Sequence, residues 1–135
     1  MRPATLKLRS LAAAIDFTVF SAVFYSYVHY FGDATEDGYA VQGCGHLLVL
    51  SIVWFVWFPL PEALWGRTLG KWACDLRAVD LSDQPITLRQ ALLRHVFDIV
   101  DTSFFGLTGL IAAKTTALNQ RVGDLAAHTK VVDER

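Results

Sequence analysis

The chemistry open to this chain rests on charged residues that lie inside or beside its apolar stretches. Segment 6–31 carries Arg9 near its start and Asp16 seven residues later, and residues 10–32 contain no other formal charge. Seven residues make two helical turns, so both side chains lie on one stripe, about 10 Å apart along the axis. An aspartate facing lipid costs about 2.5–3.5 kcal/mol on insertion scales, so we expect Asp16 to face the protein interior beside a polar partner.

A second arginine and aspartate repeat this spacing later in the chain. LRSLAAAID and LRHVFDIVD both begin Leu-Arg, and Asp101 follows Arg94 by the same seven residues. If both helices enter the membrane from one side, their charged stripes face each other and can cross-pair, which places Arg94 or a neighbouring polar group near Asp16. Asp98 lies one turn from Arg94, within reach of an i,i+4 contact.

Two readings of these charges stay open. The candidate intramembrane network, for ion transport or for structure, comprises Arg9, Asp16, Glu62, Arg94, Asp98, Asp101 and Asp124. Five carboxylates against two or three arginines leave spare negative charge, and a proton-coupled site needs such a carboxylate with its pKa raised by burial. A structural ion network needs only that each charge be paired.

The segment WGRTLGK superficially resembles a phosphate-binding loop. Only three residues separate Gly66 from Gly70, where the motif needs four, and a tryptophan follows the lysine in place of Ser or Thr. We expect an interfacial turn here, where basic and aromatic side chains contact lipid head groups. The residues expected to do so are Arg67, Lys71, Trp65 and Trp72.

Other kinds of site are not indicated by the sequence. None of the four histidines has metal-ligand spacing to another histidine or to a cysteine, and neither cysteine sits in a Cys-x-x-Cys motif. The chain shows neither a nucleophile–base arrangement nor a basic surface interleaved with aromatic residues. We therefore expect no enzyme activity, no metal, no cofactor and no nucleic-acid partner.

The elements that must position these charges follow from hydropathy. At 135 residues, 53% of them hydrophobic, the chain is long enough for a single domain that is unusually apolar. Residues 38–61 form a second stretch without formal charge, which Pro59 and Pro61 end or kink. The predicted order is a first helix at 6–31, an outer loop at 32–45, a second helix at 46–62, a cytoplasmic loop at 63–87, a third helix at 88–113 and a cytoplasmic tail at 114–135.

The third helix is too short in apolar residues to cross a membrane. Thr87 with Gln90 fits a capping box, so the helix begins near Leu88, but its uncharged part (102–113) has only 12 residues and two glycines. We predict a broken or re-entrant helix. Residues 76–81 and 129–132 have strand character and can then pair on one side as a two-stranded ribbon. The predicted class is an all-α membrane protein with two spans, this third helix and a small cytoplasmic cap.

The distribution of basic residues sets the orientation. The 12 lysines and arginines fall in three groups: up to Arg9, from Arg67 to Arg94, and from Lys114 onward. The loop with Asp33, Glu36 and Asp37 has none. Because positive charge is retained on the cytoplasmic side, the N-terminus is predicted to be cytoplasmic, the acidic loop external and the C-terminus cytoplasmic.

Four segments together resemble a known family. RSLAAAID, WGRTLGK, the LLR of the third helix and QRVGDLAAHTKVV are similar to the RDD family of bacterial membrane proteins, over nearly the whole chain. The family is named for one arginine and two aspartates, which match Arg9, Asp16 and Asp124. The sequence departs from the pattern at His128, where a glycine is expected before Thr129. The resemblance implies a small helical domain in the bacterial inner membrane, acting in transport of cations or protons.

Two functions therefore remain. The first is a small transporter subunit for cations or protons, with Asp16 as the central carboxylate and Arg9 as its gate or counter-ion. The alternative is a non-transporting accessory or assembly subunit of a larger membrane complex. Two or three helices are too few to shield five acids from lipid, so we expect the chain to form a homo-oligomer or to join other subunits.

Overall fold

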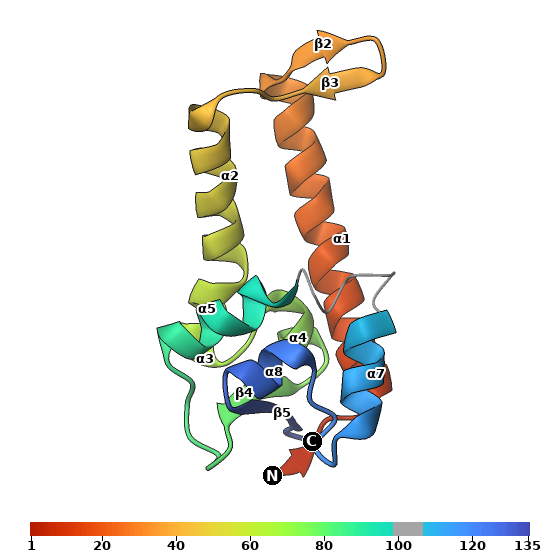
Figure 1. Ribbon diagram of the computed structural model, residues 1–135, viewed down its shortest axis with the longest axis vertical. Coiled ribbons are helices and arrows are strands. Elements are labelled where there is room, and N and C mark those ends of the chain that lie inside the picture. Colours follow the sequence, from red (N-terminus) through yellow and green to blue (C-terminus); the bar gives the residue numbers. More distant parts are fainter. Residues whose placement is uncertain (99–106) are drawn as a thin grey trace.

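Two long helices define the shape of the molecule. The computed structural model describes residues 1–98 and 107–135, and in it α1 (Leu6–Phe31) and α2 (Cys44–Trp57) rise from a common base (Figure 1). A hairpin of β2 (Asp33–Thr35) and β3 (Gly38–Ala40) joins their far ends, while both chain termini lie at the base. Glu36 and Asp37 form the two-residue turn of this hairpin, and Gly38 begins β3 opposite Thr35.

Both long segments have the length and composition of membrane spans. These are Leu6–Phe31 and Cys44–Trp65, with mean hydropathies of 1.6 and 1.9. In the most apolar 18-residue stretch of each segment, only 11% and 17% is buried inside the protein. The core helix of a soluble protein would be mostly buried, so these values, together with the apolar surface they leave outside, indicate a membrane protein.

The second span breaks where the prolines predict it. α2 ends at Trp57 and α3 (Pro59–Trp65) begins two residues later. Pro59 has no N–H to donate to the preceding turn and occupies the first position of α3, where that donor is not needed. This break confirms the predicted kink and turns Glu62 toward the base of the molecule.

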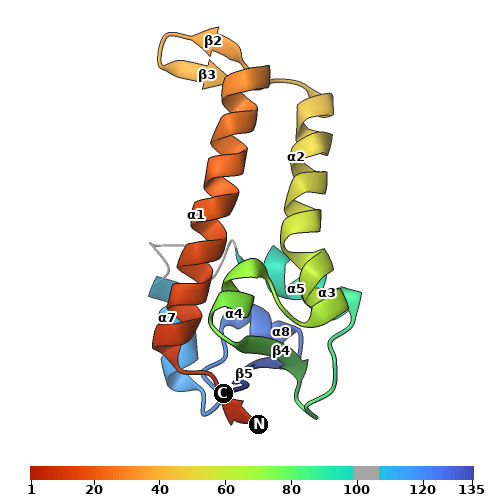
Figure 2. The same ribbon diagram turned by 180° about the vertical axis from the view of Figure 1, so that it is seen from behind.

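The remaining described elements form a compact head at the base (Figure 2). Its helices are α4 (Leu69–Ala73), α5 (Leu88–Val96), α7 (Leu107–Thr115) and α8 (Val122–Ala126). Its sheet has the order β1–β5–β4, from β1 (Arg2–Pro3), β5 (Thr129–Asp133) and β4 (Leu76–Asp80). In the register of β4 with β5, Leu76 lies opposite Asp133 and Asp80 opposite Thr129.

The predicted ribbon is thus confirmed, but the all-α class is wrong. Strand β1 adds a third strand to the ribbon, and β2 with β3 form a second small sheet in the outer loop. Two residues such as Arg2 and Pro3 are too few to show an alternating pattern, which explains why the sequence does not reveal β1. The correct description is two apolar helices joined to a head that mixes helices with a sheet.

The third apolar segment is not one straight helix. The capping box is present, with Gln90 N–H donating to Thr87 Oγ1 and Thr87 N–H donating to Gln90 Oε1, and α5 begins at Leu88 as predicted. α5 ends at Val96 and lies across the head, whereas α7 stands beside the lower part of α1 (Figures 1 and 2). The part of the predicted helix at 99–106 lies outside the described residues.

The apolar core lies in the head, away from the upper part of the spans. Its larger cluster joins Ala4 and Ala12 of the N-terminal segment to Cys74, Leu76 and Val131. Within α1 the buried residues are Arg9, Ala12 and Asp16, and within α2 no residue is buried. Positions 9, 12 and 16 share one helical stripe, so α1 turns its two charges toward the head.

Candidate functional site: a buried ring of charged residues

Asp16 caps the short helix that packs on α1. Its Oδ2 accepts a hydrogen bond from Thr68 Oγ1 at 2.5 Å, and its Oδ1 accepts one from the backbone N–H of Gly70 at 2.7 Å. Thr68 immediately precedes α4, so the carboxylate satisfies donors at the N-terminus of that helix. A side chain at Gly70 would collide with the carbonyl oxygen of Ala12, at 2.0 Å from its Cβ, so only glycine allows this approach.

Glu62 is the most heavily paired acid of the site. It is fully buried on α3, and Lys71 Nζ from α4 lies 2.7 Å from its Oε1. Arg94 Nε from α5 donates to its Oε2 at 3.0 Å, and His95 Nε2 lies 2.9 Å from the same oxygen. An isolated carboxylate would be costly to bury, and here three basic groups surround it.

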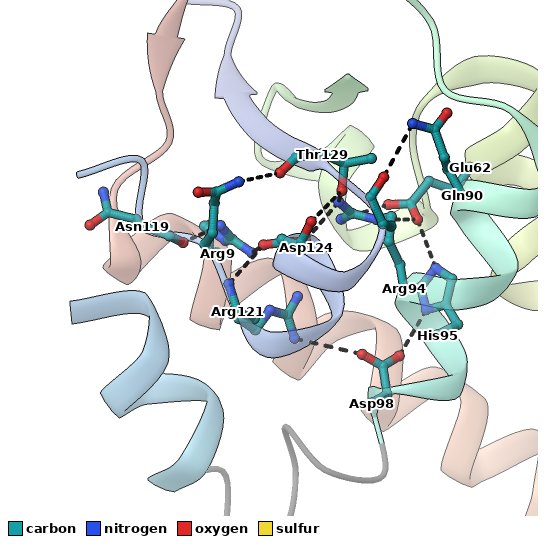
Figure 3. A network of polar contacts seen from close by, with 12 residues as sticks. Arg9, Glu62, Gln90, Arg94, His95, Asp98, Asn119, Arg121, Asp124 and Thr129 are labelled. Atoms are coloured by element: carbon teal, nitrogen blue, oxygen red, sulfur yellow. Dashed lines mark hydrogen bonds and ion pairs between the residues drawn. The ribbon is translucent and has the colours of Figure 1, made fainter. Parts of the chain in front are cut away.

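Arg94 links this acid to a second one. Its guanidinium lies between Glu62 and Asp124 of α8, with Nη1 2.6 Å from Asp124 Oδ1 (Figure 3). The same nitrogen donates to Thr129 Oγ1 at 2.6 Å. A Cβ at Gly123 would lie 2.5 Å from the carbonyl oxygen of Arg94, so glycine also permits the close packing of α8 on α5.

Arg9 closes the circuit back to α1. It donates to the carboxylate of Asp124 and to the carbonyl of Asn119 (Figure 3). The contacts run from Asp16 and Arg9 on α1 through α8, α5, α3 and α4 and return to α1 at Asp16. We call this set the buried ring; its members are Arg9, Asp16, Glu62, Thr68, Lys71, Arg94 and Asp124, each no more than 7% exposed.

A side branch leaves the ring at His95. Its Nδ1 lies 2.8 Å from Asp98 Oδ2, and Arg121 Nη1 lies 3.9 Å from Asp98 Oδ1. Burial by itself lowers the pKa of His95, but the carboxylates of Glu62 and Asp98 outweigh it and raise that pKa above its usual value. His95 therefore retains its proton to higher pH than a free histidine.

The charges of the site balance. Among the described residues, the acids Asp16, Glu62, Asp98 and Asp124 face the bases Arg9, Lys71, Arg94 and Arg121, four against four before His95 is counted. Burial raises the pKa of Asp124, but Arg94, Arg9 and Arg121 hold it well below its ordinary value. The spare negative charge inferred from the sequence is absent from the described residues, because Lys71, which was expected to contact lipid, and Arg121 supply two further cations and Asp101 lies outside this part of the chain.

One hollow borders the ring, and a second borders its side branch. A polar cavity of about 20 Å³, room for one water molecule, is lined by Arg9, Asp16, Lys71, His95, Asp98 and Arg121 among others. An open groove of about 490 Å³ runs between the spans above it and is lined mostly by aromatic residues, including Phe20, Phe24 and Trp54. His95 and Asp98 line both hollows.

The structure brings together most of the charges that the sequence singled out. Arg9, Asp16, Glu62, Arg94, Asp98 and Asp124 all lie in the ring or its branch, whereas Asp101 falls outside the described residues. The partners of Asp16 are Thr68 and Gly70, so the expected polar neighbour is present and it is not Arg94. Arg9 and Arg94 both bind Asp124, a shared partner that was not expected from the spacing of charges on the two helices.

Lys71 does not lie where the sequence predicts. It was expected among lipid head groups, but it is 6% exposed and contacts Glu62. The reason is that Gly70 brings α4 close against α1 and turns the lysine inward. Trp65 and Trp72, by contrast, are 63% and 70% exposed, and Arg67 lies at the surface beside Glu134.

Sequence reasoning missed His95, Thr68, Thr129 and Asn119. Thr68 stands at the N-cap of α4, a position that favours threonine, but its hydroxyl donates to Asp16 and does not cap the helix, so no local signal indicates this contact. His95 follows Arg94 and, like it, contacts Glu62. Nothing in the local sequence of His95 indicates a carboxylate 33 residues away. Asn119 adopts a left-handed backbone (φ 52°), which asparagine tolerates better than most residues.

Comparison with known proteins gives one match. The model of the RDD family matches residues 3–128, nearly the whole chain. Searches of curated proteins and of solved structures found no significant match. The matched range contains every residue of the buried ring.

Proposed function

This chain belongs to the RDD family, and we propose that it is a multi-pass protein of the bacterial inner membrane that serves as an accessory or assembly subunit. In this proposal the buried ring fastens the head to the two spans and carries no ions. The head, with its sheet and four short helices, is the part that the ring holds in a fixed position. The spans then present their apolar faces to lipid and to other membrane helices.

The position of the charges carries this proposal. All members of the ring lie at the base, and α1 has no formal charge from Phe17 to Phe31, a length of about 22 Å at 1.5 Å per residue. α2 has none from Cys44 to Trp57. Within the described residues a single copy therefore offers no charged relay from Asp16 to the far end, which a path for cations or protons would require.

The orientation is proposed from the same charges. The head carries the basic groups and both termini, and the β2–β3 hairpin at the other end carries Asp33, Glu36 and Asp37. Retention of positive charge on the cytoplasmic side places the head in the cytoplasm and the hairpin outside. A cysteine introduced at position 36 of a Cys44→Ser variant, which removes the exposed native thiol at the same end, should react with an impermeant maleimide in intact cells. Reaction only after lysis would reverse this orientation.

A partner is expected in the groove between the spans. Aromatic side chains of α1 and α2 line about 490 Å³ of open space that a helix of another copy or another subunit can enter. A photo-crosslinking residue at Phe20 should form an adduct with a second copy or with one discrete membrane protein. The same residue at Leu64, exposed on α3, is the control. Adducts with lipid alone at both positions would contradict an assembly role.

A second function, proton or cation transport by an oligomer, is favoured by His95. This residue lines both the polar cavity and the apolar groove, and its pKa is raised. Several copies could extend a polar path that one copy lacks. Proton flux into vesicles that His95→Gln abolishes, with the ring variants still folded, would support this function over the first.

A further inference from the structure

A second groove lies on the outside of the head, where the second span ends. It encloses about 830 Å³ and has two chemically different halves. The half toward the span is apolar and is lined by Val56, Trp57, Pro61 and Leu64. The half toward the head is lined by Arg67, Arg77 and Trp72. Among the described residues that line the groove, Thr68 alone also belongs to the buried ring.

The two arginines converge on one oxyanion. Arg67 Nη2 donates to one oxygen of Glu134, and Arg77 Nη1 lies 3.4 Å from the other. Glu134 directly follows β5, and its backbone N–H donates to the carbonyl of Asp75 at 3.0 Å, so its carboxylate lies beside these guanidiniums. Guanidiniums that bind a carboxylate can also bind a phosphodiester, because its two non-bridging oxygens share one negative charge and accept hydrogen bonds in the same way.

The position of this groove matches the interface of a membrane. Trp65 and Trp72, at its rim, are 63% and 70% exposed; Trp65 ends the apolar segment Cys44–Trp65 and Trp72 follows it by seven residues. Exposed tryptophans at the end of a span are typical of the head-group level. The arginines thus lie where lipid phosphates are expected, and the apolar half lies toward the acyl chains.

We propose that this groove binds one anionic phospholipid, with its phosphate on Arg67 and Arg77 in place of Glu134 and an acyl chain along the apolar half. The proposal rests on the membrane location proposed above. A zwitterionic lipid carries its own cation beside the phosphate and has less need of two arginines. Glu134 occupies the arginines when no lipid is bound, and its side chain, 27% exposed, can rotate toward solvent when a phosphate takes its place.

Quenching of tryptophan fluorescence by brominated lipids tests the proposal on the full-length protein. The protein is placed in phosphatidylcholine vesicles that contain increasing fractions of brominated phosphatidylglycerol, or of brominated phosphatidylcholine as reference. About 1 kcal/mol for each arginine near the surface corresponds to a preference of about 25-fold for the pair. We expect phosphatidylglycerol to quench at a correspondingly lower fraction. Glu134→Gln should strengthen this preference, because it removes the competing carboxylate.

A matched pair of double variants decides between a built site and general charge attraction. Arg67→Gln with Arg77→Gln should abolish the preference, and Lys7→Gln with Arg89→Gln, which removes the same charge at two exposed positions, should keep it. Equal quenching by both lipids, or equal loss in both double variants, would overturn the proposal. Displacement of the brominated lipid by inorganic phosphate would assign the arginines to a soluble oxyanion and also overturn it. If the wild-type protein shows no lipid preference but still forms the photo-crosslinks at Phe20, this lipid site is refuted and the proposed function is not.

Discussion

Replacing Glu62 by glutamine tests the buried ring at its most connected point. The substitution keeps the size of the side chain and removes the charge that faces Lys71 at 2.7 Å, His95 at 2.9 Å and Arg94 at 3.0 Å. Removing one partner of a buried ion pair costs about 3–5 kcal/mol, because the remaining charge stays buried without compensation. A chain of this length has a free energy of unfolding of about 7–20 kcal/mol, so the loss is a large part of the total.

Thermal unfolding in detergent, followed by size-exclusion chromatography of the heated protein, measures this loss. At about 3–4 °C for each kcal/mol in a domain of this size, Glu62→Gln should lower the melting temperature by about 10–20 °C. Glu36→Gln, an exposed acid of the outer hairpin, is the control and should change it by no more than about 2 °C.

A double variant identifies the cause of the loss. Glu62→Gln combined with Lys71→Met removes the cation that the first change leaves unpaired. The double variant should therefore lose less stability than the sum of the losses in the two single variants. If Glu62→Gln melts within about 3 °C of the wild type, or if the two effects simply add, the buried ring does not hold the head as we argue.

Three further variants test other parts of the structure. Asp16→Asn should cost about 1–2 kcal/mol, because the amide cannot accept from both Thr68 and Gly70, and adding Arg9→Gln should not rescue it; rescue would show that these two residues are paired. His95 has a raised pKa in the folded state, so its contribution is present below pH 6.5 and is lost as pH rises through that pKa. The melting temperature of the wild type should therefore fall relative to His95→Gln on going from pH 6 to pH 9, and parallel curves would exclude this role. His128→Gly should stabilise the protein by about 0.5–1 kcal/mol, since residue 128 has a left-handed backbone (φ 53°) that favours glycine; a lower melting temperature would contradict it.

The sequence predicts the scaffold well because scaffold signals are local. The apolar lengths of 6–31 and 38–61, the break at Pro59 and the capping box at Thr87 each depend on a few adjacent residues, and the structure has all of them. The sequence also shows His128 where the family pattern has a glycine before Thr129, and residue 128 has a positive φ in the structure.

The pairing of the charges could not be predicted in the same way. Arg9 binds Asp124, 115 positions away, because β5 pairs with β1 and so brings the end of α8 near the start of α1. Lys71 turns inward only because Gly70 lets α4 approach Ala12. Helical spacing gave the correct buried face of α1, but partners supplied by other elements depend on the tertiary fold.

Ion flux through the purified protein tests most directly whether the ring is structural. Vesicles that contain only this protein, at matched protein content, would be loaded with a pH-sensitive dye and exposed to proton and sodium gradients. Because the described spans carry no charged relay beyond Asp16, we predict flux equal to that of empty vesicles. A pH- or sodium-dependent flux that Asp16→Asn abolishes, in a variant that still inserts and elutes as the wild type does, would contradict the account.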